Sequence, residues 1–364
     1  MKRLGILCLV LVLTLTLTAF IPPVAQHGAE SEPVYIDQVE ILSGTDHSGS
    51  IVVDGLNRTY HYYVPSSYDG TEPMPLVFSF HGLTQNGPNQ RFLSGFNSIA
   101  EQEGFIIVYP DGQSLLGIFD PLNMRYWDCG TDVEVNFVSA MIDKFNEDFN
   151  IDLRRVYANG MSNGGMLSYH LALWLSDRIA AVASVAGPFA ADWLDEAPQP
   201  RPITVMMIYG TADPVVSFYG APIPPTPIFG DDSFEHLSMY SIVDYWRDVN
   251  WITENPEKTY IPPNIQREIH SGGVHNTQVI LYKIHGGGHT WSFRGIHTSQ
   301  LIWDHLKEHM LPVDVPVEIR PDSDHNDIKT TSAKKKAMLG LLALIPIAVA
   351  VWAIRRRGKR PEYT

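Results

Sequence analysis

The sequence is poor in cysteine and in positive charge. Its 364 residues include two cysteines, and because Cys8 lies in an apolar run near the N-terminus, Cys129 is the only one in the rest of the chain. A single thiol excludes an internal disulfide. Lysine and arginine number 26 against 40 acidic residues, for a net charge of −14. This balance disfavours nucleic acid and other polyanions as partners.

Long apolar runs are also few, and the two that stand out lie near the ends of the chain. Met1-Lys2-Arg3 precedes an uncharged run from Leu4 to Ile21, which predicts a secretory signal peptide over residues 1–25. Ala337–Ile354 is an 18-residue run without charge. A helix of this length covers about 27 Å, enough for the core of a bilayer. Basic residues are denser after it, which favours a cytoplasmic tail at 355–364.

The part between these runs is expected to be one globular domain facing outward from the cell. The two ends hold ten basic residues and one acidic residue, or +9, so the exported body carries −23. Residues 34–312 are assigned to a catalytic domain, residues 313–333 to a polar, proline-bearing stalk and residues 337–354 to a transmembrane anchor. A neutral ester or polysaccharide remains compatible with the negative body.

Short apolar runs alternate with amphipathic segments along this domain. Strands are predicted at 34–42, 59–64, 75–80, 105–109, 156–160, 180–186, 203–209 and 278–284. Helices are predicted at 89–103, 133–149, 166–176, 234–250 and 299–310. This alternation predicts an α/β fold of the α/β-hydrolase type, with a mostly parallel sheet and helices on both faces.

The stretch Gly160-Met161-Ser162-Asn163-Gly164 has the pattern of a nucleophile elbow, G-x-S-x-G. It follows a short apolar run and precedes a predicted helix, the context that such an elbow requires. Its glycines leave room for a strained serine and for close contact between strand and helix. The pattern also fits a glycine-bearing loop in front of a core helix, so partners for Ser162 are needed.

Two later residues are candidates for those partners. In α/β-hydrolases an acid and then a histidine follow the serine along the chain. Asp213 follows the predicted strand 203–209, and His289 follows the strand 278–284. Because the carboxyl ends of parallel strands share one edge of a sheet, Ser162, Asp213 and His289 are expected to meet there. Alternatively, Asp213 caps a turn before Pro214 and His289 is an ordinary loop histidine.

Backbone amides after Ser162 and in an upstream loop complete the predicted site. The N–H groups of Asn163 and Leu83 are the expected oxyanion donors, with His81 fixing the loop of Leu83. His285 and His289 are separated by three glycines, so a helical zinc pair is not expected, and neither a metal nor a cofactor is predicted. Aromatic residues that would line a substrate pocket, or else pack in the core, are Phe119, Trp127 and Trp291.

Residues 55–312 resemble the secreted esterases grouped with poly(3-hydroxybutyrate) depolymerases and type-1 carbohydrate (feruloyl and acetylxylan) esterases. The matching stretches are 80–85, 108–112, 126–129, 152–157, 160–166, 210–216 and 287–291. The resemblance implies that Ser162 is the nucleophile, Asp213 the orienting acid and His289 the general base. Leu83 and Asn163 replace a cysteine and an alanine that are frequent in the polymer-degrading members, which places the chain nearer to the feruloyl type.

Together these features predict a membrane-anchored, extracellular serine carboxylesterase that works through an acyl-enzyme. Its substrate is expected to be a small-molecule or polymer-derived ester of feruloyl, acetyl or short hydroxyalkanoate type. Two other functions share parts of the pattern: a serine peptidase of the prolyl-oligopeptidase-like class, which has the same catalytic order, and a non-catalytic surface-binding protein on a hydrolase scaffold. The insert at 217–232 is either a specificity loop over the site or a plain surface excursion.

Overall fold

The computed structural model describes residues 44–117, 120–223 and 234–313. The predicted signal peptide, the strand at 34–42, the membrane anchor and the cytoplasmic tail lie outside the described residues, as does all of the stalk but its first residue. Among the helices that the structure does describe, none is long and apolar enough to cross a bilayer.

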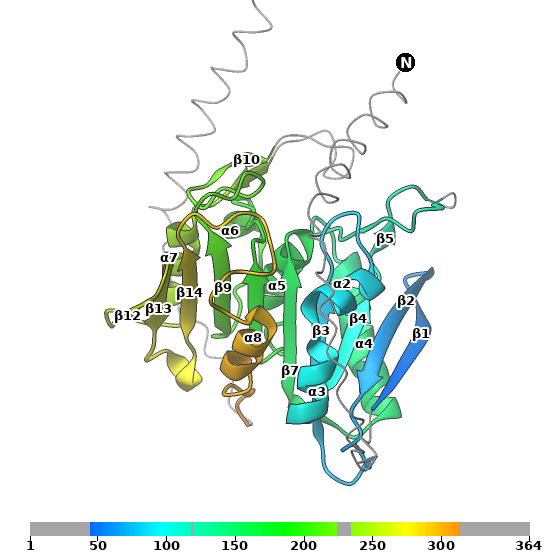
Figure 1. Cartoon of the computed structure of the whole chain (residues 1–364). Helices are drawn as coiled ribbons and strands as arrows, with labels where there is room; N and C mark the ends of the chain where they lie inside the picture. The colour runs from blue at the N-terminus through cyan, green and yellow to red at the C-terminus, as the bar shows by residue number, and fades with distance from the viewer. Residues whose placement is uncertain (1–43, 118–119, 224–233, 314–364) are drawn as a thin grey trace, which may run out of the picture. The chain divides into compact units, whose positions relative to one another are not determined.

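One twisted sheet of ten strands runs through the described part of the chain (Figure 1). Its strand order is β1-β2-β4-β3-β7-β8-β9-β14-β13-β12. The strands are β1 (Thr45–Val53), β2 (Leu56–Val64), β3 (Met74–Phe80), β4 (Ile106–Pro110), β7 (Ile151–Met161), β8 (Ala181–Val185), β9 (Thr204–Gly210), β12 (Glu257–Ile261), β13 (Ile265–His270) and β14 (Val279–Ile284). The six strands from β4 to β14 in this order are parallel, and the two at each edge are antiparallel. The predicted mostly parallel sheet is confirmed.

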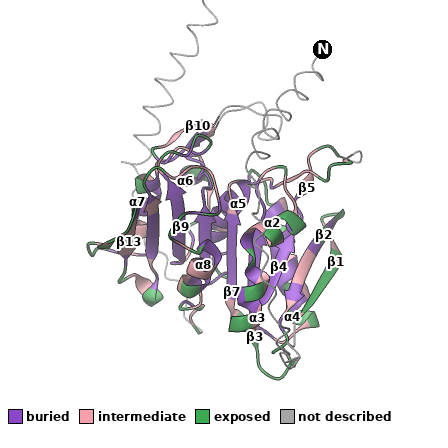
Figure 2. Ribbon diagram, viewed as in Figure 1, coloured by how far each residue is buried: buried purple, intermediate pink, exposed green. Residues whose placement is uncertain are grey.

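Helices cover both faces of the sheet. They are α2 (Gly87–Ser94), α3 (Phe96–Glu103), α4 (Val133–Asp148), α5 (Asn163–Trp174), α6 (Trp193–Glu196), α7 (Met239–Val249) and α8 (Thr298–Leu306). Side chains of α4, α5, α6 and α7 join one hydrophobic core, and those of α3 and α8 join a second core on the opposite face. The central strands are therefore buried on both sides, as Figure 2 shows in purple, which explains their continuous apolar runs.

Two small antiparallel pairs stand apart from the main sheet. The strands β5 (Gln113–Ser114) and β6 (Arg125–Tyr126) form one pair. The strands β10 (Ala221–Ile223) and β11 (Phe234–His236) form the other and flank residues 224–233, so most of the predicted insert at 217–232 lies outside the described residues.

The predicted elements differ from the observed ones mainly where local signals compete. The helix predicted at 89–103 is two helices, because Gly95 adopts a left-handed conformation (φ 63°) that ends α2 and begins α3. The helix predicted from 234 begins at Met239, where Ser238 caps it by accepting the N–H of Ser241 at 3.1 Å. The predicted helix 166–176 starts earlier, at Asn163.

Three buried histidines make the folded state sensitive to acid. His81, His170 and His309 are buried, and desolvation lowers the pKa of each from 6.5 to about 4. In the unfolded chain these groups titrate near pH 6.5, so between pH 6.5 and 4 the unfolded state binds more protons than the folded state. The free energy of unfolding therefore falls as the pH falls, by up to about 1.4 kcal/mol per pH unit for each histidine.

Urea unfolding at pH 7, 6 and 5 measures this effect directly. The free energy of unfolding is expected to fall at each step, and His170→Phe is expected to remove one histidine's share of the slope. The His170 ring packs against Trp174 and Trp193 at centroid distances of 4.2 and 5.3 Å, a site that a phenyl ring suits. A free energy of unfolding that stays constant from pH 7 to 5 would contradict this expectation.

Candidate active site

Ser162 lies in a sharp turn between strand β7 and helix α5. Its backbone angles are φ 55° and ψ −119°, a conformation that costs a non-glycine residue about 1–3 kcal/mol and is typical of functional sites. The turn is held by a hydrogen bond of 2.8 Å from the N–H of Ser162 to the Val185 carbonyl, and by one of 2.9 Å from the N–H of Met166 to the Ser162 carbonyl. The predicted strand–turn–helix context is confirmed.

The glycines of the elbow are required by close backbone packing. A Cβ placed on Gly160 would lie 2.4 Å from the carbonyl carbon of Gly164. A Cβ on Gly164 would lie 2.2 Å from the carbonyl oxygen of Phe80, at the end of β3. Neither position can hold a side chain, so β7, α5 and β3 meet at van der Waals distance around Ser162.

Asp213 and His289 are joined by a hydrogen bond, as the sequence predicts. Asp213 follows β9 and His289 follows β14, and the His289 Nδ1 lies 2.8 Å from the Asp213 Oδ2. The other carboxylate oxygen accepts the backbone N–H groups of Val215 and Val216 at 2.8 and 2.9 Å. Asp213 therefore presents a fixed acceptor that keeps the proton on Nδ1 and leaves the lone pair on Nε2.

Ser162 and His289 follow β7 and β14, which are parallel to β9, so both residues lie where the carboxyl ends of these strands meet (Figure 1). The atoms that would react are the Ser162 hydroxyl oxygen and the His289 Nε2. Within the described residues, neither atom makes a hydrogen bond. Catalytic hydrogen bonds are often long in unliganded enzymes and shorten when substrate binds. The contact between Ser162 and His289 stays a prediction.

The loop after β3 borders the nucleophile. A Cβ placed on Gly82 would lie 3.7 Å from the Cβ of Ser162, so the peptide that joins Gly82 to Leu83 lies beside the elbow. Among the hydrogen bonds of the described residues, none uses the backbone N–H of Leu83 or of Asn163 as donor. The first amides of a helix such as α5 have no partner within the helix. These are the two amides predicted to bind an oxyanion.

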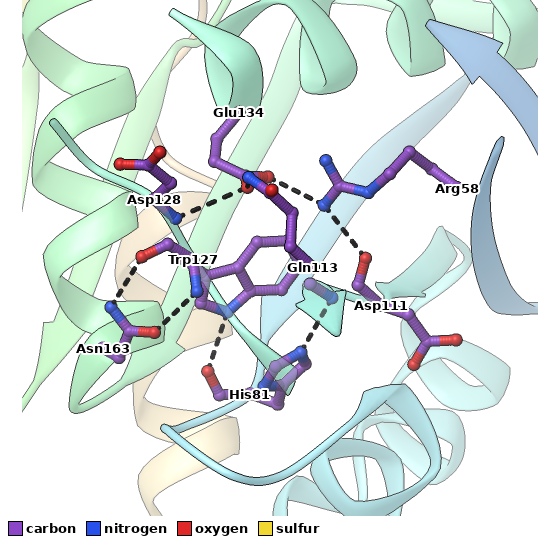
Figure 3. A network of polar contacts seen from close by, with 9 residues as sticks. Arg58, His81, Asp111, Gln113, Trp127, Asp128, Glu134 and Asn163 are labelled. Carbon is purple, nitrogen blue, oxygen red and sulfur yellow. Dashed lines mark hydrogen bonds and ion pairs between the residues drawn. The ribbon is translucent and has the colours of Figure 1, made fainter. Parts of the chain in front are cut away.

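A polar network that sequence reasoning missed lies behind this loop (Figure 3). The Asn163 side chain forms two hydrogen bonds with the backbone of Trp127, whose indole N–H donates to the His81 carbonyl at 2.9 Å. Behind Trp127, Glu134 accepts hydrogen bonds from Arg58 at 2.8 Å and from Gln113 at 2.9 Å. No local sequence pattern signals this network, because its members come from separate segments.

Two of the predicted substrate-binding aromatics, Trp127 and Trp291, are buried. Trp127 is 1% exposed and Trp291 is 3% exposed, and the Trp291 indole donates to the Ser299 hydroxyl at 3.1 Å. Phe119 lies outside the described residues. Contact of these residues with a substrate stays a prediction.

Cys129 is buried, and burial raises the pKa of its thiol well above the usual value, so the thiol is poorly reactive.

No group of three or more histidine, cysteine or acidic side chains within the described ranges is arranged so that it could hold a metal ion.

Comparisons with known proteins show similarity to esterases. Residues 58–217 match the family model described as esterase PHB depolymerase. The acetylxylan esterase/xylanase XynS20E of Neocallimastix patriciarum is 33% identical over 45% of this chain and 22% of its own length. Feruloyl esterase B of Piromyces equi is 26% identical over 68% of this chain and 44% of its own length. The chain thus spans less than half of these two relatives.

The fold also has a solved counterpart. The acetyl xylan esterase from Aspergillus awamori superposes with a TM-score of 0.51, covering 72% of this chain and 99% of that one at 15% identity. At this identity the likeness concerns the fold alone. Residues 58–217 are thus similar to the PHB depolymerase esterase family, and the described domain has an esterase-like α/β fold with a large, mostly parallel sheet.

Proposed function

We propose that the protein is a serine carboxylesterase that works through an acyl-enzyme. The observation that carries this proposal is the hydrogen bond of 2.8 Å between Asp213 and His289, at the sheet edge where the strained Ser162 also lies. A buried carboxylate that orients a histidine beside an elbow serine is the arrangement of a catalytic triad. The esterase names of the relatives support the same reaction class.

The reaction begins when the His289 Nε2 takes the proton of the Ser162 hydroxyl. The Ser162 Oγ attacks the ester carbonyl carbon, and the carbonyl electron pair moves onto its oxygen, which accepts the N–H groups of Leu83 and Asn163. When the carbonyl reforms, the C–O bond to the alcohol breaks, and the alcohol takes the proton from His289. Water then attacks the acyl-enzyme, with His289 again as base, and releases the acid and Ser162.

We propose acetyl or feruloyl esters as the first substrates to test, since the two relatives are named for those activities. Short 3-hydroxyalkanoate esters follow from the matched family model.

The site would act at the outer face of the membrane if residues 1–25 and 337–354 work as predicted. Removal of the domain from intact cells by an added protease tests that location, and full protection would contradict it.

A serine-directed fluorophosphonate probe, followed by peptide mass spectrometry, tests the mechanism. Labelling at Ser162 is expected, together with hydrolysis of p-nitrophenyl acetate and of at least one member of a feruloyl, acetyl and 3-hydroxybutyryl ester panel. An unlabelled Ser162 would favour the non-catalytic surface-binding function. Preferential cleavage of aminoacyl amides over esters would favour a peptidase.

A further inference from the structure

The two amides of the predicted oxyanion hole belong to different elements. Leu83 lies in the loop after β3, whereas Asn163 begins α5. An oxyanion hole works only if both N–H groups are held within a fraction of an ångström of the position where charge develops. Something must therefore fix the loop relative to the elbow.

The side chain of Asn163 holds Trp127 by its backbone. The Asn163 Oδ1 accepts the N–H of Trp127 at 2.7 Å, and the Asn163 Nδ2 donates to the carbonyl of Trp127 at 3.1 Å (Figure 3). Both residues are buried, Asn163 at 2% exposure. Because the Asn163 amide binds both the backbone N–H and the backbone carbonyl of Trp127, it fixes the position of Trp127 relative to α5.

Trp127 in turn holds the loop. Its indole N–H donates to the His81 carbonyl at 2.9 Å, and its ring contacts the imidazole of His81 at a centroid distance of 4.6 Å. The N–H of Gly112 donates to the Nε2 of His81, so the proton lies on Nδ1, which donates to the carbonyl of Gly82 at 2.8 Å. Because the peptide is planar, holding the Gly82 carbonyl sets the direction of the Leu83 N–H.

We propose that the side chain of Asn163 is a positioning residue, which acts through Trp127 to set the distance between the two oxyanion donors. The backbone N–H of Asn163 binds the oxyanion directly, while its side chain aligns the second donor, Leu83, through the loop. This inference rests on the proposed esterase function. It predicts that removing either link lowers kcat and leaves KM nearly unchanged, since the oxyanion forms only in the transition state.

Asn163→Ala and Trp127→Phe break the two links in the full-length protein while keeping both backbone amides. With p-nitrophenyl acetate, each variant is expected to lower kcat about ten- to a hundredfold with KM within about twofold, the size of effect that a small misplacement causes. The double variant is expected to lower kcat no more than the stronger single variant does, because both changes interrupt one chain of contacts.

Asn250→Ala is a matched control for the packing loss. Asn250 is also buried and holds Ile203 by the same pair of hydrogen bonds, both 2.8 Å, but Ile203 lies just before the first residue of β9, at the opposite edge of the sheet from Asp213. Asn250→Ala is expected to lower the melting temperature as much as Asn163→Ala does, and to leave kcat unchanged.

The outcomes separate the two proposals. A wild-type protein that neither hydrolyses esters nor reacts with fluorophosphonate overturns the esterase function. An active wild type with folded Asn163→Ala and Trp127→Phe variants that keep wild-type kcat overturns the positioning role, as do additive losses in the double variant. If Asn163→Ala does not fold, Trp127→Phe decides by itself, since it keeps the aromatic packing.

Discussion

Replacement of Ser162 by alanine is expected to lower ester turnover by about 10⁴-fold or more. The substitution removes the oxygen that attacks the carbonyl carbon in the proposed mechanism. The substitution does not change the strain of the turn, because alanine and serine have a similar conformational energy at φ 55°. The Ser162 hydroxyl also makes no hydrogen bond within the described residues, so the fold loses little.

Initial rates with p-nitrophenyl acetate measure the loss, and thermal unfolding checks the fold. The melting temperature of Ser162→Ala is expected to stay within a few degrees of the wild type. Ser98→Ala serves as a control, since Ser98 is an exposed residue of α3 whose hydroxyl donates to the Gly95 carbonyl. Near-normal turnover by Ser162→Ala would rule out the proposed mechanism.

Replacement of Glu134 by glutamine is expected to lower the free energy of unfolding by about 3–5 kcal/mol. Glu134 and Arg58 form an ion pair of 2.8 Å, with side chains 0% and 4% exposed. Burial raises the pKa of Glu134, and the nearby Arg58 charge opposes that rise. Without the carboxylate, the guanidinium stays buried without a counter-charge, and its Nε and Nη1 already have no hydrogen-bond partner.

Urea unfolding of Glu134→Gln beside Glu257→Gln tests this expectation. Glu257 pairs with Arg267 at 3.1 Å but is 69% exposed, so its loss is expected to cost less than about 1 kcal/mol. The double variant Arg58→Leu/Glu134→Leu is expected to be less destabilised than the two single changes together, because neither charge is then left buried alone. A Glu134→Gln protein within 1 kcal/mol of the wild type would contradict the argument.

Where the local pattern is strong, the structure follows the sequence closely. The run Met74–Phe80 is apolar except for Ser79 and forms the buried strand β3, and the amphipathic run after Asp132 forms α4. The order of Ser162, Asp213 and His289 along the chain, each after a strand, places all three at one edge of a parallel sheet. These features follow from local hydrophobic periodicity, which can be read in the sequence. They also follow from the general rule that parallel strands are joined by right-handed crossovers.

The sequence has no local signal for features that depend on contacts between elements or on backbone conformation. The sequence does not predict the outer antiparallel strands β1, β12 and β13. Their exposed or mixed residues lack a clear alternation, and pairing with neighbouring strands defines them. The predicted helix at 89–103 continues across Gly95 by pattern alone, and only the observed positive φ divides it. Nothing local identifies Asn163 and Trp127 as partners 36 residues apart.

The sequence by itself determined the fold class, the elbow and the order of the three candidate catalytic residues, because these depend on patterns repeated within short segments. Only the tertiary structure decided how Asp213 orients His289, that Trp127 braces the loop of Leu83 and that Arg58 pairs with Glu134 in the interior. These contacts join segments far apart in the chain, and burial and hydrogen-bond geometry select them after the sheet has brought the segments together.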